Sequence, residues 1–146
     1  MTTFNDLAVV QLREHVNASG LPAGFTNVKG DAEPALKSQL EFYDDQAMDA
    51  DKRYLVYMDG NQSSPYPSLS DERSMSIIVV GKEAQENNEA QILKGLAQSI
   101  KNYLVENFSS DTNCISSITI TSGVTGPYKS DTRFNYRIDM LVRFGV

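Results

Sequence analysis

The chain has 146 residues, a net charge of -6 and 40% hydrophobic residues, which fits one domain, residues 1–146, with its own core. Its acidic balance argues against a protein that grips nucleic acid through the phosphates, because that binding depends on Lys and Arg. No apolar run approaches the roughly 18 residues of a membrane helix, and the N-terminus lacks the basic start and apolar centre of a signal peptide. A cytoplasmic protein is therefore expected.

The N-terminal third is predicted to be one helix followed by irregular chain. Residues 4–18 carry apolar side chains at near-helical spacing and predict a helix that stops at Ser19-Gly20. Residues 20–34 contain three glycines and two prolines, which favours loops or short extended pieces. Residues 35–50 are ambiguous, since LKSQLEFY fits one helical turn or the edge of a strand. The acidic residues nearby predict a solvated turn: Asp44, Asp45, Asp49 and Asp51.

The remainder alternates strands with one strong helix. Residues 54–58 predict a strand ended by Asp59-Gly60, and a Ser/Pro-rich segment, 61–72, links it to a second strand at 73–81. Residues 88–108 predict the best helix, because Asn88 is a good N-cap and an apolar stripe follows it. A third strand is expected at 114–123, and the turn-rich loop 123–132 should join it, antiparallel, to a fourth strand at 133–144.

The last strand, RFNYRIDMLVRF, has two unlike faces. Its even-numbered residues are apolar or aromatic and are expected to meet the helices. The odd-numbered face is expected to meet water or a partner, because burying an unpaired guanidinium is costly; its charged members are Arg133, Arg137, Asp139 and Arg143. The predicted class is therefore α+β: a mostly antiparallel four-stranded twisted sheet with two helices packed on one face, plus a loop-rich N-terminal region.

Signatures of catalysis and of cofactor binding are missing from the chain. His15, the only histidine, has no neighbouring ligand residues and is expected to be a solvated helix residue. No G-x-S-x-G elbow, EF-hand loop, P-loop or G-x-G-x-x-G pattern is present. The single cysteine, Cys114, excludes an internal disulfide and is expected to be buried. We therefore expect no enzyme activity, metal or cofactor.

An exposed loop tip is the remaining candidate contact site. Gly126 and Pro127 should set a bend in the loop that joins the last two strands. Tyr128, Lys129 and Asp131 then project from its tip, where contacts to partners tend to lie. Aromatic and Arg side chains are also enriched at interface anchors, so this loop and the charged strand face together predict a protein that assembles with something.

The order of elements and the C-terminal pattern resemble a known family. A long helix, the strand pair SSITITSGVTGPYKSDTRFNYRIDMLVRF and its G-x-x-G-P-Y turn are similar to the tail terminator proteins of long-tailed bacteriophages. These minor tail proteins are also called tail completion or head–tail joining proteins. The resemblance covers roughly residues 52–146 together with an N-terminal helix.

This resemblance implies a structural virion protein without a reaction or cofactor. Subunits of the family form a hexameric ring that caps the tail tube, ends its polymerisation and offers its other face to the head connector, while DNA slides through the lumen. The implied partners are thus further copies of the chain, the tail tube protein and the head–tail connector protein. Arg133, Arg137, Asp139 and Arg143 are then expected at subunit or tube contacts, and Tyr128, Lys129 and Asp131 in a loop that faces the tube or lumen.

Two other readings stay open at this point. The chain could be another phage neck or baseplate subunit, since these share related folds. It could also be a ferredoxin-like regulatory module that binds a small molecule, although here the first helix precedes all clear strands instead of following a ligand loop.

Overall fold

The computed structural model describes residues 8–62, 71–83, 87–130 and 132–145. Its centre is a sheet with the strand order β3-β4-β5-β7-β6. The strands are β3 (Lys37–Leu40), β4 (Tyr54–Gln62), β5 (Asp71–Glu83), β6 (Ile115–Ser130) and β7 (Arg133–Phe144). A separate two-stranded sheet pairs β1 (Phe25–Thr26) with β2 (Ala32–Glu33).

The predicted four-stranded antiparallel sheet is therefore wrong, although the α+β class fits roughly. The four expected strands are present and pair antiparallel in the order β4-β5-β7-β6. β3 adds a fifth strand, parallel to β4, with Lys37 opposite Tyr54. The residues of β3 have little β-propensity of their own, so this strand forms because β4 offers it a ladder of backbone hydrogen bonds.

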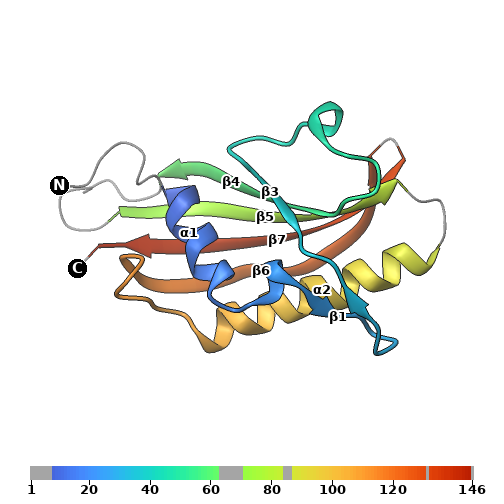
Figure 1. Cartoon of the computed structure of the whole chain (residues 1–146). Helices are drawn as coiled ribbons and strands as arrows, with labels where there is room; N and C mark the ends of the chain where they lie inside the picture. The colour runs from blue at the N-terminus through green and yellow to red at the C-terminus, as the bar shows by residue number, and fades with distance from the viewer. Residues whose placement is uncertain (1–7, 63–70, 84–86, 131, 146) are drawn as a thin grey trace.

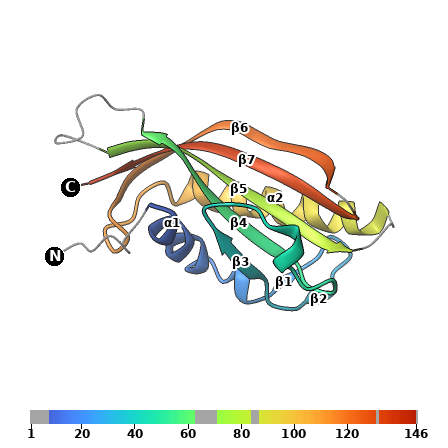
Figure 2. The same cartoon turned by 90° about the horizontal axis from the view of Figure 1, so that it is seen from above.

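The two helices lie on one face of the sheet, as predicted (Figures 1 and 2). They are α1 (Ala8–Asn17) and α2 (Asn87–Glu106). Apolar residues of both helices share one core with alternate residues of the strands, including Leu12 of α1 and Leu93 of α2. The prediction for the even-numbered face of β7 is confirmed for Tyr136, Ile138, Met140, Val142 and Phe144, which all lie in this core.

The opposite face of the sheet is only half open, which the sequence did not predict. Residues 41–52, which include the short helix η2 (Asp45–Ala47), cross over the β4 side of this face (Figure 1, top). Beneath them lies a second apolar cluster: Met48, Tyr54, Val56, Ile78 and Val80, with Tyr43 and Met58 packed against it. We call residues 41–52 the cover segment. Among the described residues, no such segment covers the β7 and β6 side of the face.

The predicted loop 123–132 is largely strand, because β6 continues to Ser130. Four register shifts between Ile115 and Tyr128 let β6 absorb extra residues while it stays paired to β7. Gly126 is needed at one of them: it has a φ of 137°, and a Cβ there would lie 2.9 Å from the Tyr136 ring. Glycine and proline therefore mark irregular strand here, and not its end.

Two further expectations about single residues are wrong. His15 is buried instead of solvated, with Nε2 2.7 Å from the carbonyl oxygen of Asn107 and its ring 5.4 Å from that of Tyr103. Cys114 is exposed instead of buried. It sits at a φ of 58° in the turn that precedes β6, so its side chain points away from the core that its apolar neighbours enter.

Candidate functional site

The uncovered half of the sheet holds an open groove of about 530 Å³. We call it the sheet groove. It lies on the face opposite the helices, next to the cluster under the cover segment. It is lined by Ile78, Ser122, Thr125, Tyr128, Asn135, Arg137 and Asp139. Three of the residues singled out from the sequence, Tyr128, Arg137 and Asp139, are thus brought together in one site.

Strand register brings these side chains together. Arg137 of β7 is opposite Ile78 on β5 and Thr125 on β6. Two positions further along β7, Asp139 is opposite Ser76 and Ser122. Since residues opposite each other in antiparallel strands point to the same face, each row presents one charged residue between shorter side chains.

Asp139 is the centre of the polar part of the groove. Its Oδ1 accepts hydrogen bonds from Ser76 Oγ at 2.6 Å and Arg137 Nε at 2.7 Å, and Ser122 Oγ donates to Oδ2 at 3.1 Å. Burial alone would raise the pKa of this carboxyl, but the three donors and the charge of Arg137 outweigh it and hold the pKa below its ordinary value. Asp139 is therefore ionised at neutral pH and fixes the Arg137 side chain.

Arg137 stays available to a partner although it is fixed. Its side chain is 46% exposed, and Nη2 donates to Ser76 Oγ at 3.1 Å. A guanidinium that is held in place loses little side-chain entropy when a second carboxylate or carbonyl approaches. Arg143 lies further along the same face, 53% exposed and paired with Glu72 at 2.9 Å. The outward position predicted for these two arginines is confirmed.

The outward position predicted for Arg133 is wrong. Arg133 is 1% exposed, and its guanidinium donates to the carbonyl oxygens of Asp49, Lys52 and Gly81 at 2.7, 3.1 and 2.8 Å. β7 begins where the cover segment crosses the end of β5, so the side chain has backbone carbonyls around it in place of water. Arg133 thus fastens the cover segment to the sheet and is not placed to reach a partner.

The two described residues of the predicted loop tip, Tyr128 and Lys129, point to opposite faces of the sheet, and Tyr128 lines the groove. Tyr128 is 52% exposed. Lys129 is exposed, and its ammonium lies 5.7 Å from the centre of the Phe134 ring, a distance at which a cation is attracted to an aromatic face. Asp131 lies outside the residues that the structure describes. Lys129 is opposite Phe134, which packs against the helix-side core, so Lys129 lies on the other face of the sheet from the groove.

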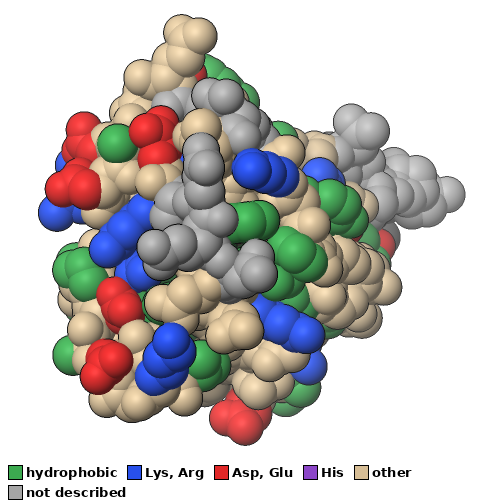
Figure 3. Space-filling view, turned by 90° about the vertical axis from the view of Figure 1, so that its right-hand side faces the viewer, with side chains coloured by type: hydrophobic (Ala, Val, Ile, Leu, Met, Phe, Trp, Pro, Cys, Tyr) green, Lys and Arg blue, Asp and Glu red, His purple; other side chains and the backbone are tan. Residues whose placement is uncertain are grey.

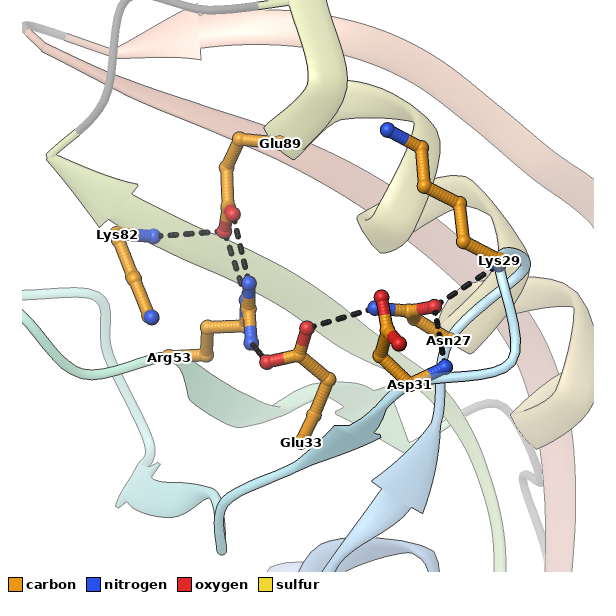
Figure 4. A network of polar contacts seen from close by, with 7 residues as sticks. All are labelled: Asn27, Lys29, Asp31, Glu33, Arg53, Lys82 and Glu89. Carbon is orange, nitrogen blue, oxygen red and sulfur yellow. Dashed lines mark hydrogen bonds and ion pairs between the residues drawn. The ribbon is translucent and has the colours of Figure 1, made fainter.

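A second polar cluster lies on the helix side of the sheet and was missed by the sequence reasoning (Figure 4). Arg53 is 4% exposed and lies between two carboxylates. It donates through Nε and Nη2 to Glu89 at 2.8 and 2.7 Å, and through Nη1 to Glu33 at 2.7 Å. Lys82 N also donates to Glu89, and Asn27 Nδ2 donates to Glu33.

This cluster is a structural fastening and not a ligand site. Burial alone would raise the pKa of Glu33, but the hydrogen bonds from Arg53 and Asn27 outweigh it and lower the pKa. Each charged group thus has partners within the protein. The cluster joins β2, the residue before β4 and the first turn of α2, with Arg53 20 residues from Glu33 and 36 residues from Glu89 along the chain. No local sequence pattern could have revealed it.

The described residues offer no group of three or more His, Cys, Asp and Glu side chains suited to a metal ion. Within the same ranges, no helix combines the length and apolar character needed to cross a membrane. Viewed from the right-hand end of Figure 1, basic, acidic and apolar side chains are interspersed (Figure 3). The acidic balance of the chain is therefore not gathered into one patch at this end.

Comparison with known proteins gives one informative match. The model of a family described as "Phage tail termination protein" matches residues 6–145. The matched range includes α1, the cover segment and every strand of the five-stranded sheet. A comparison with curated proteins gives no match.

Proposed function

Since the chain belongs to the phage tail termination protein family, we propose that it assembles into a ring, with six copies as the expected number, that caps the tail tube and ends its growth. Its other face would meet the head–tail connector protein. The family is one of structural proteins of the virion tail, so we expect the chain to act through contacts with other proteins and not through a catalysed reaction. Assembly would take place in the host cytoplasm, before the finished tail joins the head.

A ring of identical subunits needs two different surfaces on each copy that fit each other, because head-to-tail contacts are heterologous. The single observation that best supports such a role is the sheet groove. It presents a half-exposed Arg137 held by Asp139, next to an exposed Tyr128. Arg and Tyr are the types that anchor protein interfaces, and a fixed side chain pre-organises the contact.

The charge balance agrees with passage of DNA through such a ring. A net charge of -6 repels the DNA backbone on average, so a lumen formed by these subunits would not retain the duplex. The family match favours tail termination over the other two readings, a different neck or baseplate subunit and a ferredoxin-like regulatory module.

Tail length in the phage provides the test. A phage that lacks this gene is supplied with the wild-type chain or with Arg137→Glu, and tails are measured by negative-stain electron microscopy. We expect the wild type to restore tails of uniform length and Arg137→Glu to leave tubes of irregular length. Lys29→Glu is the matched control, because Lys29 is an exposed cation away from the groove. Uniform tails without any copy of the chain would refute the proposal.

A further inference from the structure

Two large apolar side chains are exposed where α2 ends. Val105 and Phe108 are 53% and 55% exposed. Val105 lies in the last turn of α2, and Phe108 follows the last helical residue, Glu106, by two positions. Aromatic side chains such as Phe108 are enriched at protein interfaces. We call Val105, Glu106 and Phe108 the α2 tip.

The α2 tip is also negatively charged. Glu106, which lies between Val105 and Phe108 in the sequence, is exposed, and the last turn of α2 carries no basic residue. The unpaired carbonyl groups at a helix C-terminus add the equivalent of about half a negative charge. Asp111, exposed in the turn that follows, adds another. This end of the helix therefore favours a cationic partner.

The tip is held in place by the rest of the protein. His15 Nε2 lies 2.7 Å from the carbonyl oxygen of Asn107, and the His15 ring packs on Tyr103 one turn earlier. This contact ties the last turn of α2 to α1. A surface that is already fixed loses less conformational entropy when it binds, so the buried position of His15 has a consequence for assembly as well as for folding.

The sheet groove has the complementary features. Tyr128 and Ile78 give it an apolar part, while the Arg137 guanidinium is half-exposed beside Asp139. The negatively charged α2 tip thus has, on the same chain, a groove with an apolar wall and a half-exposed guanidinium. Charge complementarity of this kind orients partners and excludes wrong ones.

The placement of the two surfaces suits a ring and not a twofold dimer. α2 packs against the face of β7 that carries Ile138, whereas the groove contains Arg137, on the opposite face. α2 and the groove are therefore on opposite sides of the sheet, and Figures 1 and 2 show α2 on its side. A contact between unlike surfaces on opposite sides passes from copy to copy and closes into a ring when the rotation permits it.

We propose that in the ring the α2 tip of one copy seats in the sheet groove of the next, with Glu106 beside Arg137 and Phe108 beside Tyr128. This inference rests on the proposed ring and names the surfaces that build it. Glu106 and Arg137 form an ion pair between copies, and the apolar side chains exclude water around it.

A charge swap tests the pairing. Arg137→Glu and Glu106→Arg are each expected to raise the protein concentration at half-assembly by about tenfold, measured by analytical ultracentrifugation, because each puts like charges together. The double variant is expected to assemble at nearly the wild-type concentration. Lys94→Glu, an exposed charge reversal earlier on α2, should have little effect. Circular dichroism checks that each variant is folded.

Cross-linking gives a second, independent readout. In a Cys114→Ser background, protein with Phe108→Cys is mixed with protein with Tyr128→Cys, and a short bismaleimide is added. We expect linked dimers in the mixture and very little linkage in either protein alone. If the wild-type chain forms rings but the cysteine variants are not linked, or the double charge swap does not restore assembly, the inference is overturned and the proposed function still stands. A wild-type chain that stays monomeric even on tail tubes would overturn both.

Discussion

Replacing Arg53 by leucine measures how firmly the buried ion network holds β2 and α2 to the sheet. Arg53 supplies three charge-assisted hydrogen bonds to Glu89 and Glu33, whose side chains are 6% and 13% exposed. Leucine removes all three and leaves two desolvated carboxylates. Breaking a buried pair in this way costs about 3–5 kcal/mol of unfolding free energy.

The loss of stability should be larger at Glu89 than at Glu33. Without Arg53, Glu89 keeps only the backbone N–H of Lys82 and has almost no access to water, whereas Glu33 keeps Asn27 and lies nearer the solvent. We therefore expect Glu89→Gln to cost about 2 kcal/mol and Glu33→Gln about 1 kcal/mol, since hydrogen bonds to charged groups contribute about 1.5–3 kcal/mol each when buried and less near water.

Urea denaturation followed by far-ultraviolet circular dichroism is the assay. With a urea dependence of about 2 kcal/mol per molar, the midpoint for Arg53→Leu should fall by roughly 1.5–2.5 M. A double-mutant cycle between Arg53 and Glu89 isolates their interaction from the packing of each side chain. A loss under about 1 kcal/mol for Arg53→Leu, or a larger cost at Glu33 than at Glu89, would show that the network is not the fastening described above.

Three further predictions concern the sheet. Ile138→Asp should leave the chain unfolded by circular dichroism, because the fully buried Ile138 would be replaced by a carboxylate without a partner; a folded variant would contradict its place in the core. Arg133→Lys should cost about 2–4 kcal/mol in urea, since one ammonium cannot reach all three carbonyls that the guanidinium binds; an unchanged midpoint would refute the fastening of the cover segment. The pKa of Asp139 is lowered in the folded state, so the stability it contributes is present above the carboxyl pKa of the unfolded chain, about 4, and is lost as the pH falls through the lowered value. The stability difference between the wild type and Asp139→Asn should shrink on acidification, and a difference that is constant with pH would contradict this.

The strands that the sequence revealed are those whose pattern is decided locally. In β7 one face meets the helices, so alternation alone predicted that Ile138 would be buried and Arg137 exposed. β3 was ambiguous because its four residues carry no such alternation, and its partner β4 lies beyond the intervening cover segment. Contacts between segments distant along the chain are the part that periodicity cannot supply.

The candidate site was predicted in part for the same reason. Parity placed Arg137 and Asp139 on the outer face, and both line the groove. The same alternation predicted that Arg133 would be exposed on this face, but the cover segment and the end of β5 enclose its side chain. His15 and Arg53 were missed because their burial depends on partners 92 and 36 residues away. A lone charged or titratable residue in the sequence does not reveal whether the fold will enclose it.

The outer edge of β6 limits the ways in which copies of this protein can join. Among the described strands, β6 is the last of the five-stranded sheet, so one side of its sixteen residues faces no neighbour in the ladder. Its register shifts and Pro127 interrupt the regular spacing of the outward backbone hydrogen-bonding groups, which disfavours pairing with a further strand. Open-ended, amyloid-like growth through this edge is thereby discouraged.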